Sequence, residues 1–347
     1  MKARVVELRS DTFTLPSQSM QEAMWRAAVG DSGRGEDPTV IRLQELTATM
    51  LGKEAGLFQP SGTMSNLTAL MTHCQHGDQA VVGQLSHIMW GEMNGIASIA
   101  GVLPVVVPDP QGVPVPEDVE SVIVPPFSGT PPASLVCLEN THNWACGAAV
   151  TPDEISAIAA VARKHGVPVH LDGARLFNAA VALRVDVKEL TRDVDSVCVS
   201  LCKGLAAPMG SVLVGSAGFI HRAAVAHRAL GGGMRQVGYM AAAGIVALGE
   251  MVGRLEDDHQ NARYLAELMV DFPIVKVDPH RVETNIVIFE LDQERMTRER
   301  FLVALAGFGL RASTAGKYGV RMVTHYGISR EDVEYAAQVV KNVVATV

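Results

Sequence analysis

The stretch that decides the fold is residues 194–215, VDSVCVSLCKGLAAPMGSVLVG. Two apolar runs, VDSVCVS and GSVLVG, flank a segment of small residues that carries a single lysine, Lys203. A short apolar run bounded by small or turn-forming residues is typical of a buried strand. Three interpretations of Lys203 are open: a surface charge that follows a strand, a thiol–lysine pair with Cys202, or an amine that takes part in a reaction.

Similar runs precede this stretch and alternate with helical patterns. The strand-like runs are QAVVGQ (79–84), GVLPVVVP (101–108), SLVCLEN (134–140) and VPVHL (167–171). TPDEISAIAAVARKHG (151–166) predicts a helix with Thr151 as its cap and Pro152 in its first turn. TVIRLQELTATMLG (39–52) predicts another helix, closed by Gly52. Strands separated by helices indicate an α/β fold with a mostly parallel sheet covered on both faces.

The pattern changes after Phe272. IVKVD (274–278), TNIVIFEL (284–291) and VRMVTHYGIS (320–329) predict strands, while 298–309 and 330–347 predict helices. We therefore expect an N-terminal arm and a large domain over residues 1–260, followed by a smaller α+β domain over residues 261–347.

Composition restricts the classes of protein. The net charge of −8 argues against nucleic acid as a partner, because phosphate binding needs clustered Lys and Arg. No uninterrupted apolar stretch approaches a membrane span, and the first residues contain no apolar segment of signal-peptide length. The cysteines are five in number and lack zinc-type spacing, so we expect no metal site and reduced core thiols in a cytoplasmic protein.

Five segments are expected where strands end or turn. They are QPSGTMSN (59–66), LSHIMWGE (85–92), LENTHN (138–143), HLDGARL (170–176) and SLCKGL (200–205). Ligands of parallel α/β sheets bind outside the carboxyl ends of the strands. The sequence therefore predicts that these segments form one site.

The first segment places small residues before an apolar-periodic helix. Ser61, Gly62 and Thr63 would surround an anion with backbone N–H groups and hydroxyls at the positive end of that helix. The segment lacks the lysine of a P-loop and the glycine spacing of a dinucleotide fingerprint. The alternative is an ordinary helix cap by Ser61 or Thr63.

Asp172 and Arg175 follow the strand VPVHL. Asp172 would hold a ring nitrogen or a substrate amine, and Arg175 would bind a carboxylate or a phenolic oxygen. The alternative is that Asp172 caps the next helix. His170 alternates with Asp172 and is expected on the same side of the strand, where a buried structural histidine is equally plausible.

Lys203 lies among unusually small and apolar neighbours for a solvated charge. An amine desolvated there would have a lowered pKa and could condense with an aldehyde. His87 and His142 each end an apolar run and are site candidates, with loop or core histidine as the alternative. Arg235 follows a triple glycine, where the backbone can approach an anion; a flexible hinge is its alternative.

An anion site, a carboxylate for a ring nitrogen and a buried lysine are together the requirements of pyridoxal 5′-phosphate (PLP). The phosphate needs a helix N-terminus, the pyridine nitrogen needs a carboxylate so that the ring accepts electrons, and the aldehyde needs a lysine. The combination is far more specific than any one member.

The chain resembles the low-specificity L-threonine aldolases, of the β-eliminating lyase branch of fold-type I PLP enzymes. The blocks that carry the resemblance run from Leu8 to the final helix: LRSDT, GEDPT, PSGTMSN, LENTHN, HLDGARLFNA, KGLAAPMGS, LGGGMRQ and VTH. The resemblance implies a PLP-dependent transferase-like fold, a homotetramer and active sites at subunit interfaces.

The resemblance also implies a role for each matching residue. For the cofactor, it implies a Schiff base on Lys203, ring-nitrogen pairing by Asp172, stacking by His87, proximity of Arg175 to the phenolic oxygen, and phosphate binding by Ser61, Gly62, Thr63 and, across a subunit boundary, Arg235. For the substrate, it implies that Ser10 and Arg321 hold the carboxylate, with Arg175 nearby, and that His142 contacts the β-hydroxyl.

The activity implied is reversible cleavage of L-threonine, L-allo-threonine and related β-hydroxy-α-amino acids to glycine and an aldehyde. His142, or a water that it orients, is the expected base for the β-hydroxyl proton. The alternatives are another reaction of the same fold and cofactor (β-elimination, racemisation or transaldol transfer) and a non-catalytic PLP-binding protein.

Three features depart from the pattern of the family. Arg34 stands where a tyrosine is expected, Cys202 replaces the serine before the lysine, and Trp144 and Cys146 lie beside His142. These changes bear on aldehyde preference and on threo/allo selectivity more than on cofactor use. Arg34 would favour a polar or acidic aldehyde if it faced the site, and an outward-facing arginine is the alternative.

Overall fold

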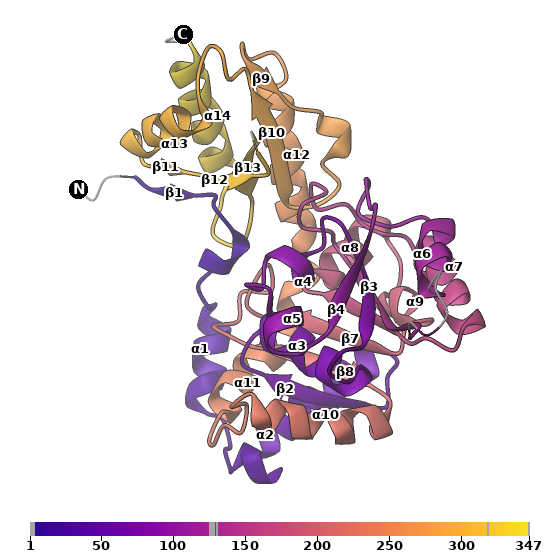
Figure 1. Ribbon diagram of the computed structural model, residues 1–347. Coiled ribbons are helices and arrows are strands. Elements are labelled where there is room, and N and C mark those ends of the chain that lie inside the picture. The colour runs from indigo at the N-terminus through magenta and orange to yellow at the C-terminus, as the bar shows by residue number, and fades with distance from the viewer. Residues whose placement is uncertain (1–3, 125–128, 130, 318, 346–347) are drawn as a thin grey trace.

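A computed structural model describes residues 4–124, 129, 131–317 and 319–345 (Figure 1). Its main element is a seven-stranded sheet with the order β2-β8-β7-β6-β5-β3-β4. The strands are β2 (Ala55–Gln59), β3 (Gln79–Gly83), β4 (Leu103–Val107), β5 (Ala133–Glu139), β6 (Val169–Gly173), β7 (Ser196–Ser200) and β8 (Ser211–Gly215). β8 pairs antiparallel with β7 and β2, and the pairs from β7 to β4 are parallel. The predicted α/β fold with a mostly parallel sheet is confirmed.

Helices cover both faces of this sheet, as the continuous apolar strands require. On one face lie α2 (Pro38–Met50), α6 (Pro116–Ile123), α7 (Pro152–Lys164), α8 (Leu176–Leu183), α9 (Val187–Thr191) and α11 (Gly238–Val246). On the other lie α3 (Gly62–His73), α4 (His87–Trp90), α5 (Gly95–Ser98) and α10 (Ala217–Ala229). In β7, Val197 and Val199 face the first set, whereas Cys198 faces the second.

The predicted helix starts are explained by local hydrogen bonds. In α7, the Thr151 side chain accepts from the Glu154 backbone N–H while the Glu154 side chain accepts from the Thr151 N–H, which is a capping box. In α2, Asp37 accepts from two N–H groups of the first turn, and Pro38 occupies the first helical position. These contacts fix where each helix begins relative to the strand before it.

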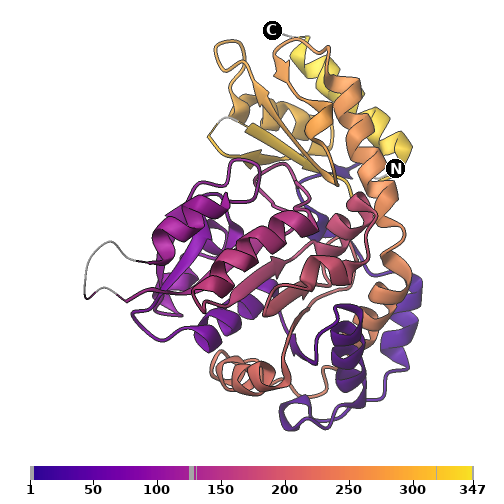
Figure 2. The ribbon, with the colours of Figure 1, turned by 90° about the vertical axis from the view of Figure 1, so that its right-hand side faces the viewer.

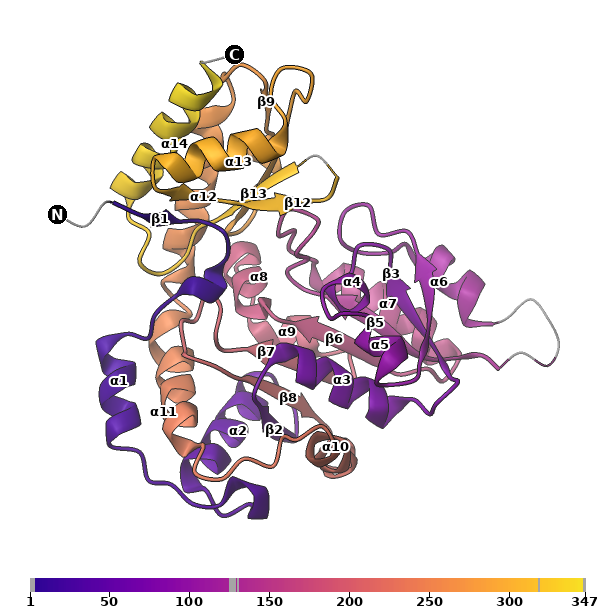
Figure 3. The same cartoon turned by 60° about the vertical axis from the view of Figure 1, so that its left-hand side comes forward.

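A smaller layer lies at one end of the sheet (Figure 3). Its antiparallel strands have the order β12-β13-β10-β9, and they are β9 (Val275–Lys276), β10 (Ile286–Leu291), β12 (Ser313–Ala315) and β13 (Gly319–Val323). Three helices complete the layer: α12 (Leu255–Met269), α13 (Arg298–Gly307) and α14 (Arg330–Val344). A two-residue strand near the N-terminus, β1 (Val6–Glu7), pairs in parallel with β11 (Leu310–Arg311).

α12 connects the two parts of the molecule (Figure 2). Leu255, its first residue, packs in the core of the large sheet, and Ala262 packs in the core of the smaller layer. The side chains of Val6 and Leu8 also pack in this second core, although they begin the chain. The division into domains at residue 260 stays a prediction. Among the described residues, no helix is long and apolar enough to cross a membrane.

Candidate active site

The five predicted segments meet at one edge of the large sheet. β2, β3, β5, β6 and β7 all run in the same direction, so their carboxyl ends lie side by side. These strands end at Gln59, Gly83, Glu139, Gly173 and Ser200, and the predicted segments span or follow those positions. The parallel topology therefore brings together residues that are far apart in the sequence.

Asp172 lies at the carboxyl end of β6, where it is only 3% exposed. Asn66 Nδ2 donates to its Oδ2 at 2.8 Å, and the Ala174 N–H donates to its Oδ1 at 3.0 Å. Burial opposes the charged form, but the charges of His87 and Lys203 and the Asn66 hydrogen bond outweigh it and lower the pKa of Asp172. The residue that precedes α8 is Arg175, so Asp172 is not the cap of that helix.

Lys203 is half-buried in the loop between β7 and β8. Its charge lowers the pKa of both Asp172 and Asp11, which means that the ammonium group lies near two buried carboxylates. Thr14 Oγ1 donates to the Lys203 carbonyl oxygen at 3.1 Å and ties the N-terminal arm to this loop. This environment is not that of a surface charge at the end of a strand.

The thiol–lysine interpretation of Cys202 finds no support in its environment. Burial raises the pKa of the Cys202 thiol despite the opposing charge of Lys203, so the reactive thiolate is disfavoured. All five cysteines are described, and all are free thiols, as the sequence predicts.

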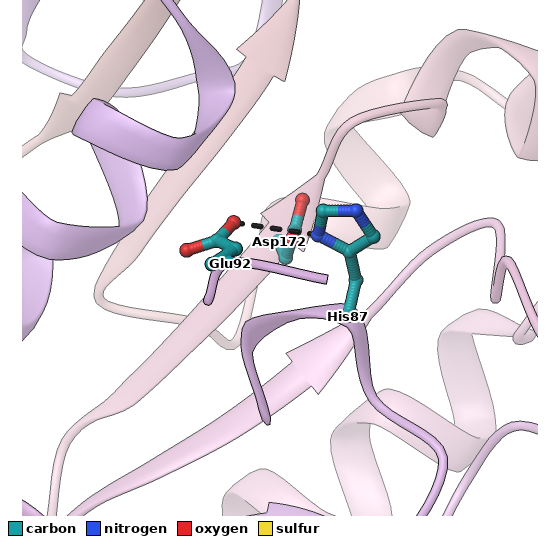
Figure 4. A group of neighbouring side chains, drawn as sticks. All are labelled: His87, Glu92 and Asp172. Atoms are coloured by element: carbon teal, nitrogen blue, oxygen red, sulfur yellow. Dashed lines mark ion pairs between the residues drawn. The ribbon is translucent and has the colours of Figure 1, made fainter. Parts of the chain in front are cut away.

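His87 opens α4 and faces Asp172 together with a carboxyl group that the sequence did not single out, Glu92 (Figure 4). His87 Nδ1 lies 3.4 Å from Glu92 Oε1, and the His87 backbone N–H donates to Glu139 Oε2 at 2.6 Å. Burial disfavours the charged imidazole, but Glu92, Asp172 and Glu139 outweigh this effect and raise the pKa of His87. The ring remains 30% exposed on the open side of the site, where a stacked partner could reach it.

One ligand atom each from His87, Glu92 and Asp172 falls within 4.8 Å of the others, a spacing that a metal ion could bridge. Asn66 Nδ2, however, donates at 2.8 Å to one oxygen of each carboxyl group. An N–H donor between the two carboxyl groups competes with a cation for the same oxygens. The donor set therefore favours an organic group that needs a carboxylate partner.

The N-terminus of α3 lies at the same edge. The Ser61 hydroxyl accepts from the Met64 N–H at 3.2 Å, so Ser61 is the cap that the alternative interpretation predicted. The first N–H groups of a helix have no partner within it, which leaves those of Gly62 and Thr63 for an anion. A Cβ on Gly62 would lie 3.0 Å from Ser200 Oγ, at the end of the strand that leads to Lys203. The cap and the anion site are thus compatible.

Two arginines meet behind the N-terminal arm. Arg175 donates from Nε and Nη2 to the two carboxylate oxygens of Asp11, at 2.7 and 2.8 Å, and from Nη1 to Asn143 Oδ1 at 3.1 Å. Arg321 Nη2 donates to the same Asn143 oxygen at 2.9 Å. One amide oxygen therefore holds two guanidinium groups side by side, with a single carboxylate, Asp11, paired to one of them.

Arg321 is 7% exposed and incompletely paired. Its Nε has no hydrogen-bond partner among the described residues, and Nη1 makes a long contact of 3.4 Å to the Arg9 carbonyl oxygen. Burial and the charge of Arg175 lower the pKa of Arg321 to about 10, so the group is still a cation at neutral pH. Ser10 follows Arg9 directly and places its hydroxyl next to Asp11. A buried, unpaired guanidinium nitrogen is the donor that a carboxylate ligand would satisfy.

His142 is fully enclosed, being 1% exposed. Its Nε2 lies 3.1 Å from Asp109 Oδ2, and its Nδ1 accepts from the Ala145 N–H at 3.2 Å. The accepting Nδ1 requires that the proton be on Nε2, so the lone pair of the ring is directed at the backbone. The neighbouring Trp144 ring lies 5.9 Å from the Arg321 guanidinium group.

Arg235 and Arg34 lie on the surface, outside this cluster. The Arg235 side chain is 61% exposed, and its Nη1 lies 3.4 Å from Asp31 Oδ1. The Arg34 side chain is 74% exposed and lies 3.7 Å from the same aspartate, so it faces outward. A single chain does not bring either arginine to the site; the expected role of Arg235 depends on a second subunit and stays a prediction.

The residues present fit PLP. The free N–H groups at the start of α3, the ionised Asp172, the amine of Lys203 and the unpaired Arg321 Nε provide for a phosphate, a ring nitrogen, an aldehyde and a substrate carboxylate. Sequence reasoning missed Asp11, Asn66, Glu92 and Asn143 as individual residues. The blocks LRSDT, PSGTMSN and LENTHN contain three of them, but a block does not reveal which of its side chains points inward.

The sheet, the lysine and the carboxylate define the class of the protein, the fold-type I PLP enzymes. Residues 7–294 match the beta-eliminating lyase family, and the chain belongs to this family. The chain is 43% identical over 340 residues to low-specificity L-threonine aldolase 1 of Arabidopsis thaliana, covering 96% of this chain and 95% of the relative. It is 38% identical over 337 residues to the low specificity L-threonine aldolase of Escherichia coli K12, covering 96% and 97%. Its fold is similar to that of a Leishmania major threonine aldolase, with a TM-score of 0.82, 18% identity and coverage of 97% and 98%.

Proposed function

We propose that this protein is a PLP-dependent aldolase that cleaves L-threonine, L-allo-threonine and related β-hydroxy-α-amino acids to glycine and an aldehyde. The observation that carries the proposal is the meeting of Lys203, Asp172 and the unpaired Arg321 Nε at one sheet edge. The near full-length likeness to low-specificity L-threonine aldolases supports the choice of substrate.

Each residue has a distinct task. When bound, PLP accepts the electrons of the broken Cα–Cβ bond. Lys203 would supply the amine that holds the cofactor. Asp172, buried and ionised, keeps a proton on the ring nitrogen, since a fixed carboxylate next to that nitrogen favours its protonated form. His87 would cover the open face of the ring, and Gly62 and Thr63 would hold the phosphate with their N–H groups.

The substrate is oriented through its carboxylate. Arg321 would donate from Nε and a terminal nitrogen to the two carboxylate oxygens, with Ser10 beside it. Arg175 cannot bind a carboxylate in the same two-point manner while Asp11 occupies its Nε and Nη2. Its remaining nitrogen, Nη1, is directed towards Asn143. We therefore assign the carboxylate to Arg321 and the neighbourhood of the phenolic oxygen to Arg175.

We assign the β-hydroxyl proton to His142 or to a water that it orients. Asp109 and the Ala145 N–H occupy both ring nitrogens of His142, so one of these bonds must open when substrate binds. We expect His142→Ala to reduce kcat about a hundredfold, the usual contribution of a positioned acid–base group. Turnover close to the wild-type rate would assign the proton to another residue.

We also propose a homotetramer in the cytoplasm, with Arg235 completing the phosphate site of a neighbouring subunit. The large exposed side chains of Leu15, Trp25 and Met93, at 76%, 88% and 89% exposure, support burial by another subunit. The free cysteines suit a reducing compartment. Analytical ultracentrifugation tests the assembly; a monomer that retains full activity would contradict it.

The deciding experiment is product analysis. Purified protein with PLP is incubated with a panel of β-hydroxy amino acids, and glycine, aldehyde, ammonia and keto acid are all measured. We expect glycine and acetaldehyde in equal amounts from threonine, and no glycine from Lys203→Ala. Release of ammonia and a keto acid, without glycine, would instead identify β-elimination on the same fold. Formation of D-allo-threonine from L-threonine, without either product pair, would identify racemisation at Cα.

A further inference from the structure

Asn66, in the second turn of α3, lies behind Asp172 and can hold its amide in only one orientation. Its Nδ2 lies 2.8 Å from Asp172 Oδ2 and 2.8 Å from Glu92 Oε1. Turning the amide over would place its carbonyl oxygen against both carboxyl groups, so the NH2 group must face them. Oδ1 then faces His170 Nε2 at 3.0 Å. Because an amide oxygen only accepts, His170 must carry its proton on Nε2.

The same logic continues on the other side of His170, which is completely buried. Burial lowers the pKa of His170 to about 4, so the ring is neutral at pH 7 and Nδ1 is an acceptor. Ser196 Oγ lies 2.9 Å from Nδ1 and must donate its hydroxyl proton there. The Ser196 oxygen can then accept from His73 Nε2, which lies 2.8 Å away.

We propose that Asn66 and His170 are positioning residues of the cofactor site, which act on Asp172 through a one-way chain of hydrogen bonds from His73 to Asp172. We name this chain the Asp172 relay; its members are His73, Ser196, His170, Asn66 and Asp172. In the relay, each group donates a hydrogen bond to the next group, and none can donate in the reverse direction. The relay therefore fixes the orientation of its own side chains, from His73 at the C-terminus of α3 to the carboxylate of Asp172.

The relay positions Asp172 and does not carry protons. Proton transfer along it would have to pass through the Asn66 amide, which is neither an acid nor a base at neutral pH. The fixed NH2 group stabilises an ionised Asp172 and holds the plane of its carboxylate, since the second oxygen is bound by the Ala174 N–H. A buried network that is fully satisfied holds its members rigidly.

The same NH2 group donates to two neighbouring carboxyl groups and lowers the pKa of each, but the other groups around them differ. Burial raises the pKa of Glu92, with the charge of Asp172 adding to the effect, while the pKa of Asp172 is lowered. Asn66 donates to both carboxyl groups, although their pKa values move in opposite directions. His170 does not touch the site itself, which makes any effect of its substitution on the cofactor indirect.

The inference rests on the proposed function, in which Asp172 pairs with the cofactor's ring nitrogen. It is tested with holoenzymes of Asn66→Leu, His170→Leu, His170→Gln and Ser196→Ala. Thr68→Val is the matched control, because Thr68 lies in the same helix, is equally buried and has a hydroxyl without a partner among the described residues. The measurements are the Kd of PLP by equilibrium dialysis, the pH titration of the bound cofactor's visible band, and kcat and KM separately.

We expect Asn66→Leu and His170→Leu to raise the Kd of PLP about tenfold or more and to shift the titration of the band, the size of effect that loss of an outer-shell partner commonly has. We expect kcat to fall by a similar factor with KM changed less than threefold. His170→Gln keeps a donor toward Asn66 and should stay within threefold of wild type, as should Thr68→Val. Ser196→Ala, the mildest change, should raise the Kd about threefold, and it tests the relay if a leucine variant does not fold.

The inference is overturned if the folded leucine variants keep the wild-type Kd and titration, if Ser196→Ala has no effect while the leucine variants fail to fold, or if His170→Gln loses as much as His170→Leu. Asp172→Ala separates this result from a failure of the proposed function. If Asp172→Ala also leaves the Kd and the band unchanged, the assignment of the cofactor itself is wrong. If only Asp172→Ala changes them, the relay alone is wrong.

Discussion

Two polar regions of the site are built on opposite plans. In the Asp172 relay, each donor that faces another member has an acceptor, and all the hydrogen bonds are donated in the direction from His73 to Asp172. In the second region, which we call the arginine pair (Asp11, Asn143, Arg175 and Arg321), two guanidinium groups share one amide oxygen, and the carboxylate of Asp11 is paired to Arg175 alone. The relay is complete without a ligand, and the arginine pair is not.

The difference follows from what each region has to hold. In the proposed function, Asp172 would face a group that stays bound through every turnover, so rigidity would cost nothing there. Arg321 would face a substrate that must enter and leave, and a nitrogen without a partner among the described residues provides affinity only when the ligand supplies the acceptor. Complete pairing of Arg321 within the protein would compete with the substrate. In the proposed function, the incompletely paired arginine pair would therefore recognise the substrate, and the fully paired Asp172 relay would hold the cofactor.

The largest effect on catalysis should come from substitution of Asp172, the last member of the relay. We expect Asp172→Ala to lower kcat about a thousandfold, because the buried charge that stabilises the protonated ring is lost. Steady-state kinetics with saturating PLP measures this. Asp172→Asn keeps the shape without the charge and should lose nearly as much; an Asn variant within tenfold of wild type would mean that shape matters more than charge.

The next effect concerns the ion pair between Asp11 and Arg175. Asp11→Ala leaves the buried Arg175 without its counter-ion, and we expect the free energy of unfolding to fall by about 3 kcal/mol. Urea denaturation of the variant measures the change. The control is Glu120→Ala, whose partner Lys164 lies at the surface, and whose loss should cost far less. Equal losses in the two variants would contradict the contrast between buried and exposed pairs.

Substitution of Arg321, the incompletely paired arginine, should change KM more than kcat. We expect Arg321→Ala to raise KM for threonine about a hundredfold, the cost of losing a desolvated two-point contact to a carboxylate. Kinetics over a wide range of threonine concentrations separates KM from kcat. Arg311→Ala, a half-exposed arginine on a neighbouring strand, is the control and should change KM less than twofold. An unchanged KM in Arg321→Ala would assign the carboxylate to Arg175.

The smallest effect is on the pH dependence of stability. In the folded protein the pKa of His170 is about 4, against 6.5 when unfolded, so below pH 6.5 the unfolded chain binds a proton that the folded chain does not. Stability should therefore fall as the pH drops from 6.5 towards 4. Between pH 8 and pH 5, wild type should lose about 2 kcal/mol more than His170→Gln, which has no titrating ring. Parallel losses in the two proteins, measured by urea denaturation at each pH, would show that His170 is charged in the folded state.

Much of the site could be predicted because it lies at strand ends. Lys203, Asp172, His87 and the start of α3 each follow an apolar run, and the parallel arrangement predicts that such ends converge. Asp11 could not be found in this way. It lies in a short arm before the first strand of the large sheet, and its partner Arg175 is 164 residues away in the sequence. Contacts of this kind leave no periodic trace in the sequence.

Sequence alone determined the class of the fold, the edge of the sheet at which the candidate residues meet, and the types of those residues. Those properties depend on local patterns: apolar runs, helix caps and the small residues around a lysine. Only the tertiary structure decided that β1 joins the second core, that the Asn66 amide faces Asp172, that both nitrogens of His142 are engaged, and that the buried Nε of Arg321 has no partner among the described residues. A hydrogen bond depends on position to within a few tenths of an ångström and on which atom donates. That information exists only when distant segments are packed together.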